Sequence, residues 1–233
     1  MIRLLSYADL LSITNAIFGF LAILVLFLDT LEMRIHISLS LILIGLVIDG
    51  IDGIVARKFG GSDLGEYLES MADMTTLSIA PAVFIYFIYS EVVGDNLLLY
   101  LYLLFALVLF LGFAIIRLAS FHIMKDDKFF VGLPASASTV ILLVLAYFEV
   151  DYLFILPSVV IIGAFMASDI SFPKPGIKIN AFATFFILLT ILFGKNYLGF
   201  APILLFIGIL IYAIGGPIYL KFFRKNSDTK LSK

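Results

Sequence analysis

The chain contains no cysteine and little charge, and both absences restrict what it can be. Without cysteine it forms no disulfide, no thiolate metal site and no cysteine nucleophile. Charged residues make up 14% of its 233 residues and hydrophobic residues 63%, whereas soluble proteins are about 25% charged. The net charge of -2 offers no basic surface, so no nucleic-acid partner is expected. No basic segment followed by a cleavage site marks the N-terminus, and we expect no removable signal peptide.

The hydrophobic residues occur in long runs, and the mean hydropathy is +1.17. Many runs approach about 20 residues, the length at which a helix crosses a bilayer. Unbroken runs lack the alternating pattern of a lipid-facing strand, which argues against a membrane β-barrel. We therefore predict an all-α integral membrane protein with about eight transmembrane helices. The expected spans are residues 8–28, 35–57, 63–89, 96–124, 133–148, 152–167, 179–194 and 198–222.

The basic residues are distributed unevenly between the two sides that these spans create. With the N-terminus inside, only Arg34 and Lys195 of the 15 Lys and Arg residues fall outside. Cytoplasmic loops of membrane proteins carry the excess of Lys and Arg. We therefore expect a multi-pass protein of the cell membrane with both termini in the cytoplasm. The segment that joins the second and third spans then faces the cytoplasm as well.

Four carboxylates at helical spacing lie close to this cytoplasmic edge. Asp49 and Asp52 share a face at the end of the second span, and Glu69 and Asp73 share a face at the start of the third. The glycine pair at 60–61 lets the chain reverse between them. Acids at membrane depth are costly and usually functional, and four together repel one another unless cations lie between them. Oxygen ligands favour hard cations, so we predict one or two Mg²⁺ or Mn²⁺ ions, with Ca²⁺ as the alternative.

The acidic stretch follows the spacing Asp-x2-Asp-Gly-x2-Ala-Arg-x7-Gly-x3-Glu-x3-Asp. This pattern resembles the signature of the CDP-alcohol phosphatidyltransferases, integral membrane enzymes of phospholipid synthesis. Its fixed positions are Asp49, Asp52, Gly53, Ala56, Arg57, Gly65, Glu69 and Asp73. The chain departs from the pattern at one of them, because Glu69 stands where the family usually has Asp. Glutamate can still ligate a metal, but its longer side chain places the carboxylate differently.

The resemblance implies a role for each of these residues. Asp49, Asp52, Glu69 and Asp73 would bind the metal ions, and Asp73 would also be catalytic, as the general base for the incoming alcohol. The CDP-lipid would contact a second set of residues, which are Asn15, Gly53, Ala56, Arg57 and Gly65. The resemblance also implies a homodimer. We expect a single transmembrane catalytic domain over residues 1–225, followed by a short basic cytoplasmic tail over 226–233.

Other segments resemble the phosphatidylserine synthase branch of the family. They are Thr14-Asn15 with Gly19-Phe20, Ala80-Pro81, residues 130–134 and residues 168–173. This likeness implies a CDP-lipid donor and L-serine as the acceptor. A serine carboxylate needs a cationic partner, and Arg117 at the cytoplasmic end of the fourth span is the candidate. Residues 125–128 would form a solvated loop over the site, while His122 and His36 are expected to lie away from the chemistry.

Two alternatives remain open at this point. Within the family, the acceptor could be glycerol phosphate or inositol phosphate, but each would require a further basic cluster, and only Arg57, Lys58 and Arg117 are near the acids. Outside the family, a cation-coupled membrane transporter also uses intramembrane acids. Transporters place such acids near the membrane midplane in repeated, broken helices, whereas here they lie at one edge of two adjacent helices. Metal-dependent transfer to serine, with release of CMP, is therefore the favoured hypothesis.

Overall fold

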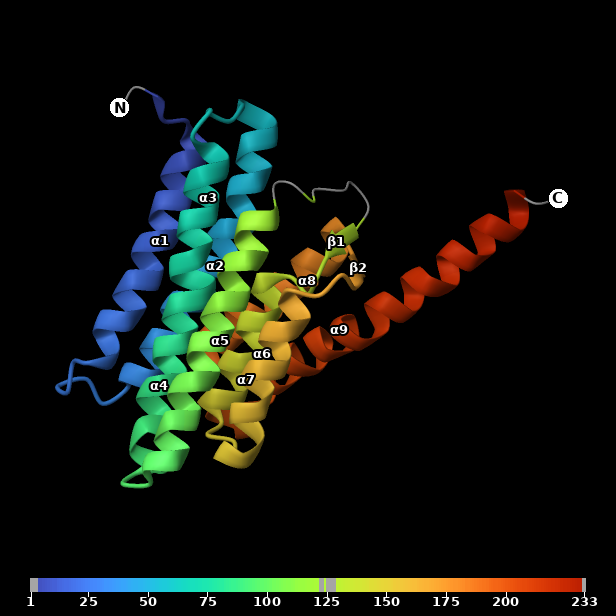
Figure 1. Ribbon diagram of the computed structural model, residues 1–233. Helices are drawn as coiled ribbons and strands as arrows, with labels where there is room; N and C mark the ends of the chain where they lie inside the picture. The colour runs from blue at the N-terminus through green and yellow to red at the C-terminus, as the bar shows by residue number, and fades with distance from the viewer. Residues whose placement is uncertain (1–3, 122–123, 125–128, 232–233) are drawn as a thin grey trace.

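The computed structural model describes residues 4–121, 124 and 129–231, and its helices run roughly side by side (Figure 1). The helices in chain order are α1 Tyr7–Leu26, α2 Arg34–Phe59, α3 Gly65–Asp73, the π-helical segment η2 Met74–Ile79, α4 Ala80–Val93, α5 Leu97–Phe121, α6 Ala135–Tyr147, α7 Tyr152–Met166, α8 Ile177–Phe193 and α9 Asn196–Leu231. α3, η2 and α4 form one continuous rod, Gly65–Val93. Each expected span corresponds to one rod, and the ends differ by a few residues except at the end of α9.

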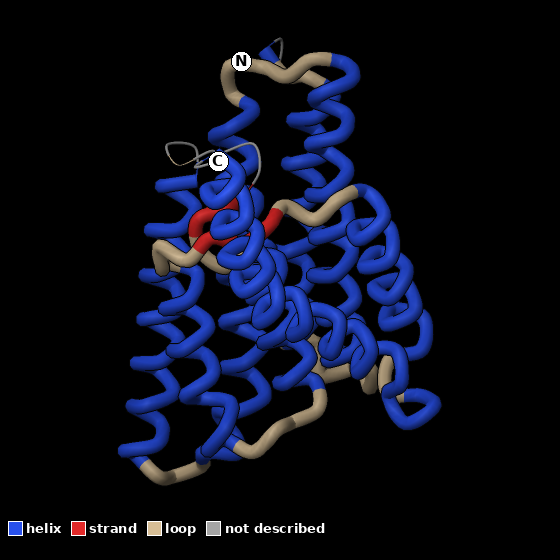
Figure 2. Tube along the Cα trace, turned by 90° about the vertical axis from the view of Figure 1, so that its right-hand side faces the viewer, coloured by secondary structure: helices blue, strands red, loops and turns tan. Residues whose placement is uncertain are grey.

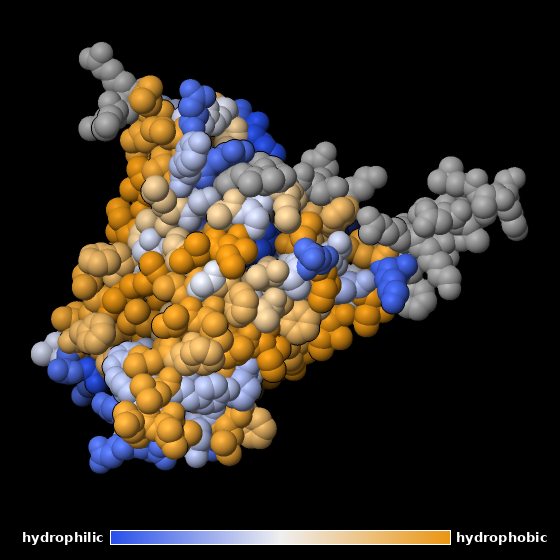
Figure 3. Space-filling view, viewed as in Figure 1, coloured by the Kyte–Doolittle hydropathy of each residue, from blue (hydrophilic) through white to orange (hydrophobic). Residues whose placement is uncertain are grey.

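Among the residues that the structure describes, five of the rods are long and apolar enough to cross a membrane. They are Tyr7–Leu26, Arg34–Phe59, Gly65–Val93, Leu97–Ser120 and Asn196–Lys221. Helices α6, α7 and α8 are also apolar but have only 13, 15 and 17 residues. Hydrophobic residues cover the middle of the visible surface, and hydrophilic residues gather toward its two ends (Figure 3). The structure therefore agrees with an all-α, multi-pass membrane protein.

α6 lies at the centre of the bundle. Ten of its 13 residues are buried, and Leu142 and Leu143 have no exposed surface. A helix that is apolar all round is typical of such a position, because every face contacts other helices. With about 1.5 Å per residue, α6 is shorter than the hydrocarbon layer of about 30 Å.

A two-stranded antiparallel ribbon precedes α6 and α8, and the sequence did not predict it. Strand β1, Phe129–Val131, pairs with β2, Ser171–Pro173, and the ribbon is set in from the end of the bundle (Figure 2). Gly132 follows β1 at φ +79°, and its N–H donates to the Ile170 carbonyl at 2.7 Å. A side chain at this position would run into the Met166 carbonyl. The ribbon lies directly before both helices in the chain, and Phe172, the middle residue of β2, is buried.

Pro81 lies inside the third expected span, which predicts a kink and a backbone carbonyl that a neighbouring helix must satisfy. The structure has the π-helical turn η2 directly before the start of α4, which contains the proline. The carbonyl four residues before Pro81 belongs to Leu77, and Thr139 Oγ1 of α6 donates to it at 2.5 Å. A neighbouring helix therefore does satisfy this carbonyl. π-Turns are frequent at functional sites, and this one follows Asp73 directly.

α9 leaves the bundle toward its C-terminal end and runs on to Leu231 (Figure 1). Residues 197–199 near its start have left-handed backbone angles. Farther along, the Tyr212 hydroxyl donates to the Pro173 carbonyl of β2 at 3.0 Å. The helix thus continues into residues 226–231 of the predicted tail. The predicted loop at 125–128 and His122 lie outside the described residues.

Hydrogen bonds around His36 connect the helices at the end of the bundle that lies away from the acids. The two ring nitrogens of His36 lie 3.0 Å from the Tyr147 hydroxyl and 3.0 Å from the Ile191 carbonyl. The Lys195 N–H donates to the same Tyr147 hydroxyl at 3.1 Å. These bonds join α2, α6, α8 and the segment before α9, so His36 has a structural role.

Candidate active site

Two antiparallel helices bring the predicted acids together. Asp49 and Asp52 lie toward the end of α2, and Glu69 and Asp73 lie on α3, after a turn in which Gly60 has φ +86°. The carboxyl groups of Asp49 and Asp73 are within hydrogen-bonding reach of each other. Asp52 and Glu69 are close enough to both to interact with them electrostatically. Like charges this close repel, so the site needs either a shared proton or a bound cation.

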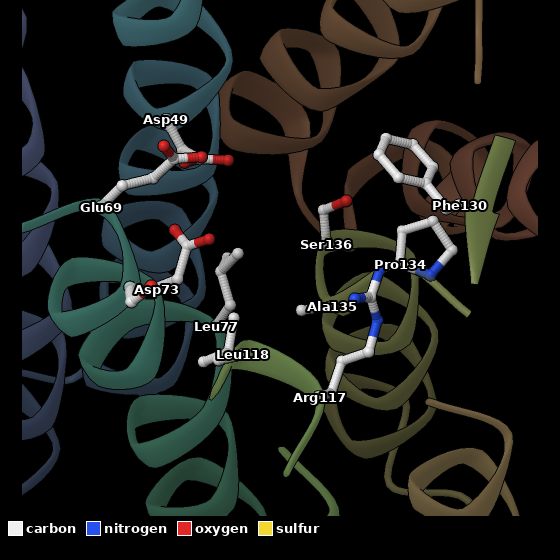
Figure 4. Close-up of a pocket in the computed structure, with 11 residues that line it drawn as sticks. Asp49, Glu69, Asp73, Leu77, Arg117, Leu118, Phe130, Pro134, Ala135 and Ser136 are labelled. Atoms are coloured by element: carbon white, nitrogen blue, oxygen red, sulfur yellow. The ribbon is translucent and has the colours of Figure 1, made fainter. Parts of the chain in front are cut away.

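A cavity of about 190 Å³ opens beside these acids (Figure 4). Asp49, Glu69 and Asp73 form one wall, and Arg117 of α5 reaches in from the facing wall. The remaining lining residues are Ser70, Leu77, Leu118, Phe130, Pro134, Ala135 and Ser136. The segment from β1 to the start of α6 therefore completes the wall that carries Arg117. Three carboxylates and a guanidinium share one small space.

Arg117 lies deeper than a helix anchor would. Only 7% of its surface is exposed. An arginine that anchors a helix extends its charged group toward water and the lipid headgroups. Arg117 instead points into the cavity, where a guanidinium can bind a carboxylate or a phosphate with two parallel hydrogen bonds (Figure 4). The structure thus brings the predicted serine-binding residue to the same cavity as the acids.

Two side chains of α1 donate hydrogen bonds to two of the acids. Ser12 Oγ donates to Asp52 Oδ2 at 2.7 Å, and Asn15 Nδ2 donates to Asp73 Oδ1 at 3.4 Å. Asp52 is buried, with 5% of its surface exposed, and Asn15 has no exposed surface. Asn15, predicted to contact the CDP-lipid, therefore contacts Asp73 and does not reach the open face of α2.

The other residues predicted to bind the CDP-lipid lie outside the cavity, along α2 and at the start of α3. Gly53 borders open space, because a Cβ there would meet only Arg57 Nη1, at 3.8 Å. Arg57 is exposed and Ala56 is half-buried. Gly65 packs more closely, and a Cβ there would lie 3.4 Å from Asp9 Oδ1. A ligand can therefore approach α2 at Gly53 and Arg57, while Gly65 also serves helix packing.

The acids supply hard oxygen ligands, the type preferred by Mg²⁺, Mn²⁺ and Ca²⁺. In the part of the chain that the structure describes, no three Asp, Glu, His or Cys side chains form a ready-made metal shell. The carboxyl groups of Asp49 and Asp73 lie close together, and the Ser12 hydroxyl donates to Asp52. The donor chemistry of the four acids fits a hard divalent cation.

Sequence reasoning missed the polar residues of α1 that accompany Asn15. Asp9 and Ser12 precede Asn15 by six and three residues, so all three lie on one side of the helix. That spacing is the signal that could have revealed them. Ser70 and Ser136 in the cavity carry no comparable signal, because only the fold places α3 and the start of α6 around the same cavity.

A family model described as CDP-alcohol phosphatidyltransferase matches residues 5–214 of the chain. A Methanocaldococcus jannaschii protein named CDP-diacylglycerol–serine O-phosphatidyltransferase is 34% identical over 173 residues, covering 74% of this chain and 76% of that protein. An archaetidylserine synthase of Methanothermobacter thermautotrophicus is 30% identical over 174 residues, with coverages of 71% and 69%. A Bacillus subtilis protein with the same name as the first is 30% identical over 143 residues, with coverages of 59% and 73%.

Proposed function

This chain belongs to the CDP-alcohol phosphatidyltransferases, and on that premise we propose that it is a phosphatidylserine synthase. A phosphatidyl-type group passes from a CDP-lipid to the hydroxyl of L-serine, and CMP is released. The observation that carries the proposal is the cavity in which Asp49, Glu69 and Asp73 face Arg117. The acids can hold cations at a diphosphate and accept a proton, and the guanidinium can bind the serine carboxylate. The names of the relatives support the same acceptor.

Asp73 takes the proton from the serine hydroxyl. The hydroxyl oxygen then bonds to the phosphorus that carries the lipid, and the bond from that phosphorus to the oxygen of CMP breaks. A positioned base contributes about 10²–10⁴-fold to a step of this kind. Asp73 suits the role because it lines the cavity and its carboxylate accepts an N–H from Asn15, which limits its orientations.

Asp49, Asp52, Glu69 and Asp73 would hold one or two Mg²⁺ or Mn²⁺ ions. Such ions, when bound, stabilise the negative charge that develops on the diphosphate as CMP leaves. The close approach of the Asp49 and Asp73 carboxyl groups supports this assignment, because it is unfavourable without positive charge or a shared proton. Glu69 lines the same cavity, so its longer side chain keeps a carboxylate at the site.

Arg117 selects serine over acceptors that carry a phosphate. Its planar guanidinium matches the geometry of a carboxylate. A phosphate-bearing acceptor would need more positive charge, and among the described residues that line the cavity only Arg117 is basic. The CDP group would lie along the open face of α2 at Gly53, Ala56 and Arg57, with Gly65 at its edge.

Eight membrane-crossing rods would surround this site, and the site and both termini would lie in the cytoplasm. The start of α1, the turn from α2 to α3 and the end of α9 lie toward the same end of the molecule (Figure 1). The excess of basic residues expected at this end supports the orientation. The lipid tails of the donor would then lie in the bilayer beside the helices, and two copies would assemble as a homodimer.

The test is CMP release by the purified protein, given a CDP-lipid and Mg²⁺ or Mn²⁺, with serine, glycerol phosphate or inositol phosphate added separately. We expect release that depends on serine and stops when EDTA removes the metal. Release with only a phosphate acceptor would overturn the serine assignment. No release with any acceptor would overturn the transferase assignment.

Arg117→Ala tests the acceptor pocket. Hydrogen bonds to a charged group contribute about 1.5–3 kcal/mol, so we expect the KM for serine to rise about 10–100-fold. The KM for the CDP-lipid should not change. Lys178→Ala, an exposed residue of α8 outside the cavity, is the control and should leave both constants unchanged. An unchanged serine KM in Arg117→Ala would assign the carboxylate to another group.

A further inference from the structure

α1 carries three buried polar residues on one face. Asp9, Ser12 and Asn15 are spaced three residues apart and are 1%, 4% and 0% exposed. Buried polar groups are costly unless they are hydrogen-bonded, and this cost is greatest in a protein surrounded by lipid. We call these three residues the polar stripe of α1. Each of them contacts a different part of the acidic helix pair.

Ser12 and Asn15 each donate to one oxygen of an acid. Ser12 Oγ lies 2.7 Å from Asp52 Oδ2 and 3.4 Å from the carbonyl of Ala8, so its proton belongs to the shorter bond. Asn15 Nδ2 donates to Asp73 Oδ1 at 3.4 Å. One helix thus contacts a carboxylate of α2 and a carboxylate of α3.

Asp9 extends the stripe to the turn between the two acidic helices. Its carboxylate accepts the Ser6 N–H at 2.6 Å and lies beside Gly65, where a Cβ would be 3.4 Å from Asp9 Oδ1. The stripe therefore follows the helix pair from the turn inward.

Close packing around Asn15 restricts its movement. Thr76 Oγ1 of η2 donates to the Asn15 carbonyl at 2.8 Å. A Cβ on Gly45 would lie 2.8 Å from Asn15 Oδ1, and a Cβ on Gly19 would lie 2.7 Å from Thr76 Cα. Glycine at both positions lets α1, α2 and η2 approach this closely, and the close contact fixes the depth of Asn15 relative to Asp73.

We propose that Ser12 and Asn15 are positioning residues that set the orientation and separation of Asp52 and Asp73. Each donor occupies one carboxylate oxygen and so directs the other oxygen toward the ligand. The inference rests on the proposed metal-dependent transfer. Residues that orient metal ligands in this way usually change metal affinity or activity by about 10–100-fold when they are replaced.

Ser12→Ala and Ser38→Ala form a matched pair. Both hydroxyls are buried between α1 and α2, but Ser38 Oγ donates to the Ala22 carbonyl, at 2.8 Å, and not to an acid. We expect Ser12→Ala to weaken Mn²⁺ binding about tenfold, measured by electron paramagnetic resonance without substrate. Ser38→Ala should bind Mn²⁺ as the wild type does, even if both variants lose thermal stability. Ser12→Thr keeps the hydroxyl and should restore most of the affinity.

Asn15→Ala should lower kcat about 10–100-fold while the KM for the CDP-lipid changes less than about twofold. Asn15→Asp should be worse, because it replaces the donor with a second negative charge beside Asp73. Thr190→Val is the control, since its buried hydroxyl donates to the Phe186 carbonyl of α8, outside the cavity. The two positions are assayed separately, so a variant that fails to fold at one of them leaves the other test intact.

The outcomes separate this inference from the proposed function. A wild-type protein that binds Mn²⁺ but releases no CMP with serine contradicts only the proposed reaction. An active wild type in which Ser12→Ala binds Mn²⁺ like Ser38→Ala, and Asn15→Ala keeps its kcat, overturns the positioning role alone. A wild type that binds no Mn²⁺ overturns both.

Discussion

Asp73 is the acid on which the proposed proton transfer depends. Asp73→Asn keeps the size of the side chain and removes the base, so we expect turnover to fall by about 10²–10⁴-fold. Metal-dependent binding of the CDP-lipid should be largely kept, because Asp49, Asp52 and Glu69 remain. CMP release and direct lipid binding measure the two effects. Asp63→Asn, an exposed acid in the turn before α3, is the control, and full activity of Asp73→Asn would remove Asp73 as the base.

Glu69 has the charge that the family pattern expects but a longer side chain. It lines the cavity with Asp49 and Asp73, so its charge should matter more than its length. We expect Glu69→Asp to keep activity within about tenfold and Glu69→Gln to lose at least about 10–100-fold, as for other groups that act on a bound metal. The measurement is kcat as a function of metal concentration. Equal activity of Glu69→Gln and the wild type would exclude a role for this carboxylate.

The sequence predicted the positions of some site residues but not of others. Asp49 and Asp73 were predictable as neighbours, because helical spacing fixes the face of each acid and a short glycine turn fixes the antiparallel pairing. Ser12 was not, since a serine in a membrane helix commonly bonds a carbonyl of its own helix. Its contact with Asp52 joins positions 40 residues apart and depends on how α1 packs against α2.

Gly132 joins strand β1 to the segment that lines the cavity before α6. Its φ of +79° is unfavourable for any other residue, and a Cβ would run into the Met166 carbonyl. We expect Gly132→Ala to destabilise the protein by about 1–3 kcal/mol, seen as a lower midpoint of thermal unfolding in detergent. Gly112→Ala is the matched control, because a Cβ on this glycine of α5 would meet nothing within 4 Å. Equal midpoints for the two variants would contradict the constraint.

The helices were predictable from the sequence, and the ribbon was not. Long apolar runs define rods such as α2 and α5 because burial in lipid requires every backbone group to bond within the helix. Strands β1 and β2 have three residues each, too few for an alternating pattern, and their partners lie about 40 residues apart along the chain. The short lengths of α6 and α8 were predictable from the hydropathy pattern, because the expected spans 133–148 and 179–194 are short as well.

We predict the orientation of the whole molecule in the membrane from its charges. Asp63 and Asp95 are exposed residues that flank the continuous rod Gly65–Val93. This rod of 29 residues is longer than the hydrocarbon layer of about 30 Å, so we expect its two ends to lie on opposite sides. The positive-inside rule predicts that Asp63, with the acids, lies in the cytoplasm and that Asp95 lies outside.

The absence of native cysteine makes this orientation directly measurable, because a single introduced thiol is then the only one in the chain. A membrane-impermeant maleimide applied to intact cells should label Asp95→Cys and leave Asp63→Cys unlabelled until the membrane is opened. The unmodified protein, which cannot react, is the control for background. Labelling of Asp63→Cys alone would place the acids outside the cell. The bilayer would then prevent the site from taking serine from the cytoplasm and from releasing CMP into it. That result would contradict both the predicted orientation and the cytoplasmic site.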